Sequence, residues 1–268
     1  MDSARPSAVE RALAAVGGPF VRPVSVALEL WSIFFLTLRY LVVGRRTRGQ
    51  IAEQLFIIGN KSVLFITATL GFLGMISIFQ VALQVKTILP DFTMIGPAFI
   101  KTMVREFGPT ITGLMVATRT GSAIAAEIGS MVVTEQVDAL RMSNADPVNY
   151  LVVPRFVASI VMVFMLTIYA VLVATLTGML MGHFGFDIPV ATFLKMTLVE
   201  WEDVWVGMSK ALAYGAAIPV IAGHAGLNAT GGSEGVGWAT TRSVVNCSFA
   251  VIVLDFILSG LGYMVFAE

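Results

Sequence analysis

The sequence predicts an all-α integral membrane protein: an amino-terminal interfacial helix, five transmembrane helices, and a cytoplasmic helix between the second and third spans. Hydrophobic residues make up 57% of the 268 residues and charged residues only 13%, whereas soluble domains have about 25% charged residues. Apolar stretches of about 20 residues recur, the length that crosses a hydrocarbon core of about 30 Å. A polar stretch at 127–141 interrupts them. We expect two regions, 1–50 and 51–268.

Composition and motifs exclude several classes of function. The net charge is zero, so no basic surface indicates nucleic-acid binding, and the single Cys247 cannot form a disulfide within the chain. The glycine-rich segment 231–242 lacks the Lys-Ser/Thr that ends a phosphate-binding loop. His183 and His224 are isolated from each other and from the cysteine, which favours structural roles over a metal site. We expect no cofactor, metal or nucleotide site in this chain.

The amino-terminal segment 24–43 is apolar but contains Glu29 and Arg39, and a basic cluster of Arg45, Arg46 and Arg48 follows it. This pattern is typical of a helix that lies in the membrane interface with its arginines near the headgroups. Twenty apolar-rich residues can also cross a bilayer, so a sixth transmembrane helix is the alternative. Residues 1–23 have no continuous apolar region of the kind that a cleavable signal requires.

Five apolar stretches predict the transmembrane helices. They cover 63–85, 96–118, 150–181, 204–225 and 244–266, and the third is long enough to tilt or to extend beyond the bilayer. Gly71 and Gly74 in the first stretch predict close helix packing. More basic residues lie in the segments on the side of the membrane that holds the amino terminus than in the loops on the opposite side. By the positive-inside rule, the amino terminus and the polar helix are therefore cytoplasmic.

Charged residues inside the predicted spans are candidates for function. Lys101, Arg105 and Glu106 lie in the second span, Lys210 in the fourth and Asp255 in the fifth. A charge near the bilayer centre costs at least about 2.5 kcal/mol, so each must face a wet cavity or an opposite charge. The two basic residues of the second span are four apart on one helix face, which suits an anionic ligand.

The same positions predict particular pairings. Glu106 lies about 100° around the helix from Arg105, so we expect these two not to pair, whereas Glu106 and Asp255 are candidate partners of Lys210. Arg242 precedes Asp255 by 13 residues, roughly 20 Å along a helix, and should act near the cytoplasmic end. The alternative is that the charges form buried ion pairs that only fix helix packing.

The polar helix at 127–141 is the candidate contact for a cytoplasmic motor. It carries Glu127, Glu135, Asp138 and Arg141, and its apolar residues fall on several sides, which indicates that it is covered on several sides. Pro147 ends it and sets the turn into the third span. An inert re-entry loop is the alternative, because loops at the headgroups also need polar residues.

The runs GSAIAAEIGSMVVTEQVDAL and DPVNYLVVPR closely resemble the MlaE (YrbE) family of bacterial ABC transporter permeases. The resemblance extends through REFGP, SKALAYG and ATTRSVV to VIVLDF and covers nearly everything after residue 50. It implies a lipid cavity at charged positions and an ATPase-contacting coupling helix. The cavity positions are Arg105, Glu106, Lys210, Asp255 and Arg242; the coupling positions are Glu127, Glu135, Asp138 and Arg141.

The resemblance also implies partners and a location. Such permeases are homodimers of the bacterial inner membrane that move phospholipids or other hydrophobic molecules between it and the outer envelope. A cytoplasmic ABC ATPase binds the ATP, an MCE-domain protein assembles on the outer side, and a small STAS-domain protein can join them. From the residues alone, an ion-coupled secondary transporter using Glu106 or Asp255 stays open. An intramembrane lipid enzyme has only Ser122 and His224 as candidates.

Overall fold

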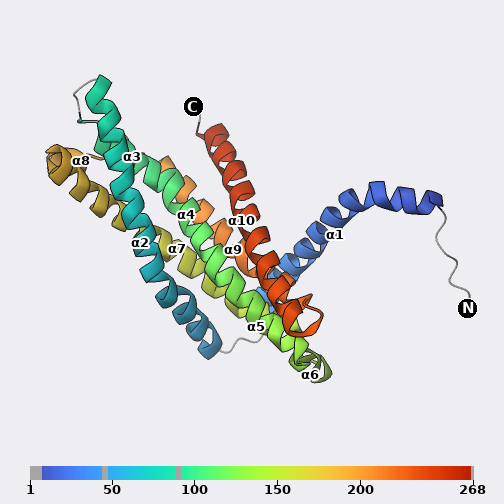
Figure 1. The fold of residues 1–268 in the computed structure, drawn as a ribbon. Coiled ribbons are helices and arrows are strands. Elements are labelled where there is room, and N and C mark those ends of the chain that lie inside the picture. Colours follow the sequence, from blue (N-terminus) through green and yellow to red (C-terminus); the bar gives the residue numbers. More distant parts are fainter. Residues whose placement is uncertain (1–7, 44–47, 89–91, 267–268) are drawn as a thin grey trace, which may run out of the picture.

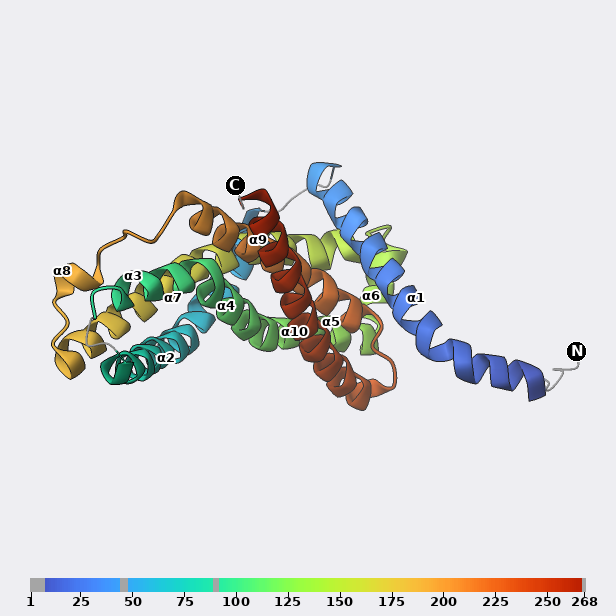
Figure 2. The same cartoon turned by 90° about the horizontal axis from the view of Figure 1, so that it is seen from above.

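The computed structural model describes residues 8–43, 48–88 and 92–266, and every regular element in these ranges is a helix. The predicted all-α class is therefore confirmed. Arg45 and Arg46 of the expected basic cluster lie outside the described residues. The long helices are α1 (Ala8–Val43), α2 (Arg48–Ile88), α7 (Val153–Phe186), α9 (Trp201–Leu227) and α10 (Gly232–Val265). All except α1 run side by side in one bundle, and the amino-terminal part of α1 leads away from it (Figures 1 and 2).

Five helices are long and apolar enough to cross a membrane: Ser25–Val43, Gly49–Thr87, Val148–Phe186, Trp201–Leu227 and Gly232–Val265. Four of them contain or overlap the expected spans at 63–85, 150–181, 204–225 and 244–266. The expected span at 96–118 is absent from this set because its helical run is divided. It stays a prediction, as does the choice between an interfacial and a spanning α1.

The divided run contains three α-helices and two π-helical turns in direct succession: α3 (Ile95–Thr102), η1 (Met103–Phe107), α4 (Gly108–Val116), η2 (Ala117–Gly121) and α5 (Ser122–Val133). Pro109 has no N–H and would clash with the carbonyl four residues earlier in a regular helix. The turn widens instead, and the amide of Gly108 donates to the carbonyl of Met103, five residues back. The π turn η3 (Val148–Val152) precedes Pro154 in the same way.

The predicted polar helix at 127–141 is not one helix. Residues 127–133 complete α5, Thr134 and Glu135 form a turn, and α6 (Gln136–Met142) follows. Glu135 adopts a left-handed backbone conformation with φ of 60°, which a continuous α-helix cannot contain. The prediction of a single helix was wrong because the sequence has neither Gly nor Pro at this break.

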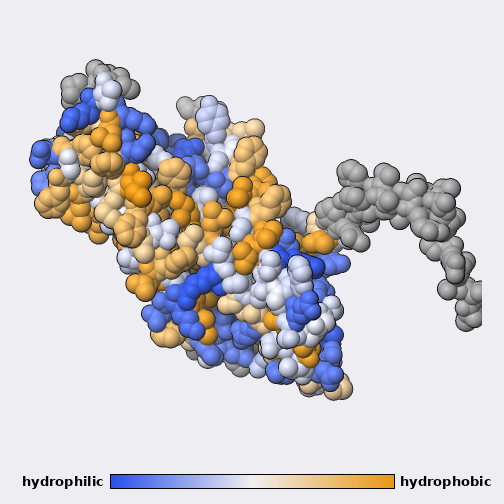
Figure 3. All heavy atoms as spheres, viewed as in Figure 1, coloured by the Kyte–Doolittle hydropathy of each residue, from blue (hydrophilic) through white to orange (hydrophobic). Residues whose placement is uncertain are grey.

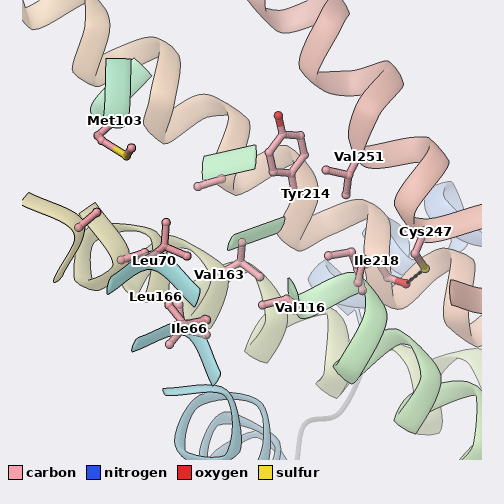
Figure 4. Close-up of a cluster of buried hydrophobic side chains, with 14 of the residues drawn as sticks. Ile66, Leu70, Met103, Val116, Val163, Leu166, Tyr214, Ile218, Cys247 and Val251 are labelled. Atoms are coloured by element: carbon pink, nitrogen blue, oxygen red, sulfur yellow. Dashed lines mark hydrogen bonds between the residues drawn. The ribbon is translucent and has the colours of Figure 1, made fainter. Parts of the chain in front are cut away.

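Apolar side chains from α2, α4, α7, α9 and α10 meet in the core (Figure 4). Ile66, Leu70, Val163, Tyr214 and Ile218 are buried there. Lipid tails are as apolar as these side chains, so association of the helices depends on close packing. A Cβ atom on Gly74 of α2 would lie 2.4 Å from the carbonyl oxygen of Ala174 in α7, so the glycine is required for this contact.

The two ends of the bundle differ from its middle in polarity. Hydrophobic residues dominate the middle of the face seen in Figure 3, and hydrophilic residues gather at the end with α6 and at the opposite end. The short helix α8 (Val190–Phe193) lies at that opposite end (Figure 1). An apolar belt between two polar ends is the surface of a multi-pass membrane protein.

Candidate functional site: a charge cluster at the helix break

Six charged side chains, three basic and three acidic, form one connected network at the divided helix. We call it the charge cluster: Lys101, Arg105, Glu106, Asp203, Lys210 and Asp255. They come from α3, η1, α9 and α10. The ion pairs between the divided helix and α9 join residues that are 98 to 104 positions apart in sequence. The structure therefore brings together four of the five predicted cavity residues, all except Arg242.

Lys210 is the most buried member of the cluster, with none of its side chain exposed. Its Nζ atom contacts a carboxylate oxygen of Glu106 and lies 3.0 Å from Oδ1 of Asp255, so the predicted pairing with both carboxylates is confirmed. Asp255 also accepts hydrogen bonds of 2.8 Å from the hydroxyls of Thr110 and Tyr214. These contacts with two carboxylates offset the loss of hydration of the buried Lys210 ammonium group.

Asp203 at the start of α9 holds the other half of the cluster. Its Oδ1 accepts a 2.9 Å hydrogen bond from Arg105, and its Oδ2 lies 3.4 Å from Nζ of Lys101. The amide of Glu200 donates to the same carboxylate at 3.1 Å, as part of a capping box. Asp203 of the same chain therefore balances the charges of Lys101 and Arg105, which share one helix face.

The contact between η1 and α9 depends on Gly207, one turn before Lys210. A Cβ atom at this position would lie 2.1 Å from the carbonyl oxygen of Val104, which no side chain can tolerate. The missing side chain lets α9 approach the π turn closely, and the turn itself widens the spacing of the residues around it. Local sequence thus determines where the charges of the two helices meet.

The prediction that Arg105 and Glu106 do not pair was wrong. Nε of Arg105 lies 3.8 Å from Oε1 of Glu106. Both residues lie in η1, where the backbone departs from the 100° per residue of a regular helix, and both side chains are long enough to bend toward each other. The pair joins the two halves of the cluster, and Ser259 adds a 3.2 Å hydrogen bond to Glu106 from α10.

The cluster is electrically neutral, but its members differ in accessibility. Asp203 and Lys210 are buried, whereas the side chains of Arg105, Asp255, Glu106 and Lys101 are 24%, 25%, 33% and 36% exposed. A ligand that approaches the cluster therefore meets two basic and two acidic groups. An anionic ligand can contact the Arg105 guanidinium, which has five N–H donors and uses one for its bond to Asp203.

Arg242 lies apart from the charge cluster. It is exposed on α10, 13 residues before Asp255, and within the described part of the chain it makes no ion pair or hydrogen bond. This position agrees with the expectation that it acts near the end of the bundle rather than beside Asp255. Its assignment to a ligand cavity stays a prediction.

The predicted coupling residues occupy the end of the bundle with α6 (Figure 1). Glu135, Asp138 and Arg141 are exposed, and the last two form a pair of 3.0 Å on the helix surface. Glu127 instead pairs at 2.7 Å with Arg155, which is 6% exposed and also donates to the carbonyl of Leu151. A buried arginine therefore connects the end of α5 to the start of α7.

Sequence reasoning missed Asp203, Thr110, Tyr214 and Ser259 as members of the site. Asp203 follows Glu200 and Glu202, and such an acidic group between two apolar stretches is typical of a loop outside the membrane. The like charges of Lys101 and Arg105 were the signal that could have found it, because they require an acid nearby. The hydroxyl residues carry no comparable signal, since Thr, Tyr and Ser are common in apolar helices.

Two further sequence candidates have local partners. Nε2 of His224 lies 2.8 Å from a carboxylate oxygen of Glu29 in α1, and the hydroxyl of Ser122 donates to the carbonyl of Arg119. The two residues thus do not form a nucleophile and base pair within the described ranges. Among the described residues, no group of three His, Cys, Asp or Glu side chains could hold a metal ion.

Comparison with known proteins places these features in a family. The family described as Permease MlaE matches residues 51–261. A probable ABC transporter permease protein of Synechocystis is 36% identical over 245 residues, which cover 88% of this chain and 93% of that protein. The intermembrane phospholipid transport system permease protein MlaE of Haemophilus influenzae is 34% identical over 217 residues, 79% of this chain and 82% of that protein.

Proposed function

Because the chain belongs to the MlaE permease family, we propose that it is the membrane-spanning subunit of an ABC transporter that moves phospholipids or similar hydrophobic anions between the inner membrane and the outer envelope. The charge cluster is the observation that carries the proposal. Charges within an apolar bundle are costly, and their usual roles are ligand binding and transport. ATP is bound by a separate cytoplasmic ATPase, since residues 1–268 contain no phosphate-binding loop.

The substrate headgroup lies against the exposed side of Arg105. A phosphate accepts a bidentate pair of hydrogen bonds from a guanidinium, and Arg105 keeps donors free while one bonds Asp203. Lys210 is unsuited to direct contact because its side chain is fully buried between two carboxylates. It acts on the substrate only through the positions of Glu106 and Asp255. The apolar side chains of the bundle surround the tails.

The α6 end of the bundle contacts the ATPase. Glu135, Asp138 and Arg141 are exposed at the outer side of the short connection between two spans, which suits a groove on a partner. Glu127 transmits the movement through its bond to Arg155, because α7 begins there and packs along α2. The divided run from Ile95 to Val133 connects this end to the charge cluster through one continuous backbone.

Two contacts support an interfacial α1 rather than a sixth span. Glu29 pairs with His224 near the end of α9, and the Tyr40 hydroxyl donates to Asp146 beside α6 at 2.9 Å. Both contacts lie at the α6 end of the bundle, although 11 residues, or about 16 Å of helix, separate them along α1. This helix therefore lies across one end of the bundle. With that end cytoplasmic, the amino terminus is cytoplasmic in a bacterial inner membrane.

A second copy of the chain completes the cavity, and an MCE-domain protein and a small STAS-domain protein complete the transporter. Support for the homodimer comes from α10, whose exposed apolar residues recur along one face. Val245, Phe249, Ile252 and Phe256 are each more than half exposed. Their spacing of three and four residues is that of a helix-packing stripe. The partners on either side of the membrane are inferred from family membership.

Reconstitution tests the function and separates it from ion-coupled secondary transport. The chain, with and without its ATPase, is placed in vesicles that contain a labelled phospholipid, and transfer to acceptor vesicles is followed. We expect transfer that requires both ATPase and ATP and that ignores an imposed proton or sodium gradient. Transfer driven by the gradient without the ATPase would favour the alternative, in which Glu106 or Asp255 binds the ion.

A further inference from the structure

A groove of about 380 Å³ lies between α1 and α9, and none of the six side chains of the charge cluster lines it. Leu30, Trp31 and Phe34 of α1 line one wall, and Ala216, Ala217 and Ile221 of α9 line the other. All of these side chains are apolar. Its volume falls in the range of about 300–1,000 Å³ that is typical of ligand sites.

The sequence keeps this groove open by combining small and large side chains. Alanines on α9 leave a shallow wall, whereas the aromatic rings of α1 are held by one another and by the bundle. Trp31 stacks on Phe35 with ring centroids 5.5 Å apart, and Phe34 packs against Phe156 of α7 at 6.2 Å. Trp31 is 57% exposed, so the groove is accessible from the side of the bundle.

One end of the groove is polar. His224 lies one turn beyond Ile221 on α9, and its Nε2 atom is 2.8 Å from a carboxylate oxygen of Glu29. The Glu29 side chain is 57% exposed. An ionised carboxylate has about four acceptor positions, so this one can also accept an ammonium donor. The groove is thus apolar along its length and anionic at its accessible end.

The length of the groove matches one leaflet of a bilayer. Ala213, which lines its inner part, and His224, at its polar end, are 11 residues apart, or about 16 Å along α9. Half of a hydrocarbon core of about 30 Å is about 15 Å. The polar end is near the end of α9 on the α6 side, where headgroups lie, and the apolar end is near the middle of that helix.

We propose that the groove between α1 and α9 is a second lipid site, which holds one acyl chain of an amine-bearing phospholipid with its ammonium group at Glu29. This site goes beyond the proposed transport, because it takes lipid from the leaflet at the α6 end and lies apart from the charge cluster. The lining of the groove and the charge cluster share no residue: Leu254 lines the groove, whereas its neighbour Asp255 bonds Tyr214 and Lys210 in the cluster.

Photo-crosslinking of the full chain in lipid nanodiscs tests the site. The nanodiscs contain phosphatidylethanolamine and phosphatidylglycerol, with a trace of phosphatidylethanolamine that carries a diazirine on one acyl chain. We expect labelled peptides from 27–34 and 213–221. Ala216→Phe fills the groove and should lower this labelling about tenfold, as expected when several buried methylenes lose their site. Ala68→Phe on the exposed face of α2 adds the same ring outside the groove and should leave it unchanged.

The headgroup is tested with the same probe on a glycerol headgroup, which lacks the amine. We expect weaker groove labelling from this probe, and Glu29→Gln should remove the difference. Labelling that is spread evenly over the lipid-facing helices and unaffected by Ala216→Phe would overturn the site and indicate annular lipid only. Equal labelling by both probes would overturn the assignment of the polar end. No ATPase is present, so failure here and failure of ATP-driven transport are separate results.

Discussion

The substitution Lys210→Met tests whether the charge cluster stabilises the helix break. It removes a fully buried ammonium and replaces it with an apolar side chain of similar length, leaving Glu106 and Asp255 without their cation. Removing one partner of a buried pair typically costs about 3–5 kcal/mol. The two carboxylates are 33% and 25% exposed, and Asp255 keeps its bonds from Thr110 and Tyr214. We therefore expect Lys210→Met to lower the free energy of unfolding by about 3 kcal/mol, the lower end of this range.

Thermal unfolding of the purified chain in detergent measures this cost. At about 2–4 °C per kcal/mol for a chain of this size, the melting temperature should fall by roughly 6–12 °C. Lys195→Met is the matched control, because Lys195 is exposed outside the long helices and should change the melting temperature by less than about 2 °C. Combining Lys210→Met with Asp255→Asn should restore part of the loss, since one uncompensated charge is then removed.

An unchanged melting temperature for Lys210→Met would show that the charge cluster does not stabilise the helix break. It would mean that water or counterions compensate both carboxylates, and that the pairing of Lys210 contributes nothing to the position of α9. A loss of stability that Asp255→Asn deepens rather than relieves would also contradict this explanation, because the uncompensated charge of Asp255 would then not be the source of the loss.

The other predictions concern helix packing and coupling. Gly207→Leu should push α9 away from η1 and lower the melting temperature, whereas Gly237→Leu, where nothing lies within 4 Å of a Cβ, should not. Arg155→Met should reduce lipid-stimulated ATP hydrolysis with ATPase binding retained, because it breaks the bond to Glu127 inside this chain; loss of binding would contradict this role. Reversing the charge of both Glu135 and Asp138 should weaken ATPase binding in a pull-down assay, and unchanged binding would exclude the α6 contact.

Sequence patterns predicted the long helices well because lipid exposure imposes one simple requirement. Each spanning helix must satisfy its own backbone and present apolar side chains, so α7 and α9 follow directly from long, predominantly apolar runs. The break at Glu135 had no such signal. Its left-handed backbone depends on how α5 and α6 pack, and no glycine or proline indicates it.

One half of the charge cluster, around Lys210, could be predicted from the sequence for a similar reason. An intramembrane charge needs a partner, so Lys210 could be matched with Glu106 and Asp255 from their positions in the predicted spans. Asp203 was missed because its acidic neighbours made it resemble a loop residue, although the like charges of Lys101 and Arg105 require an acid nearby. The contact between Arg105 and Glu106 depends on the π turn, and helix geometry at 100° per residue gives the wrong answer there.

The proposed contact of Arg105 with the substrate headgroup is tested by transport with the variant Arg105→Gln. Arg105→Gln leaves Asp203 paired with Lys101 and with the amide of Glu200, so the fold should persist. With the ATPase present, we expect ATP-driven phospholipid transfer to fall by about tenfold or more, as when a charged hydrogen bond to the ligand is lost. Lys195→Gln should leave transfer unchanged. Full transfer and full lipid co-purification by Arg105→Gln would show that Arg105 does not bind the substrate headgroup.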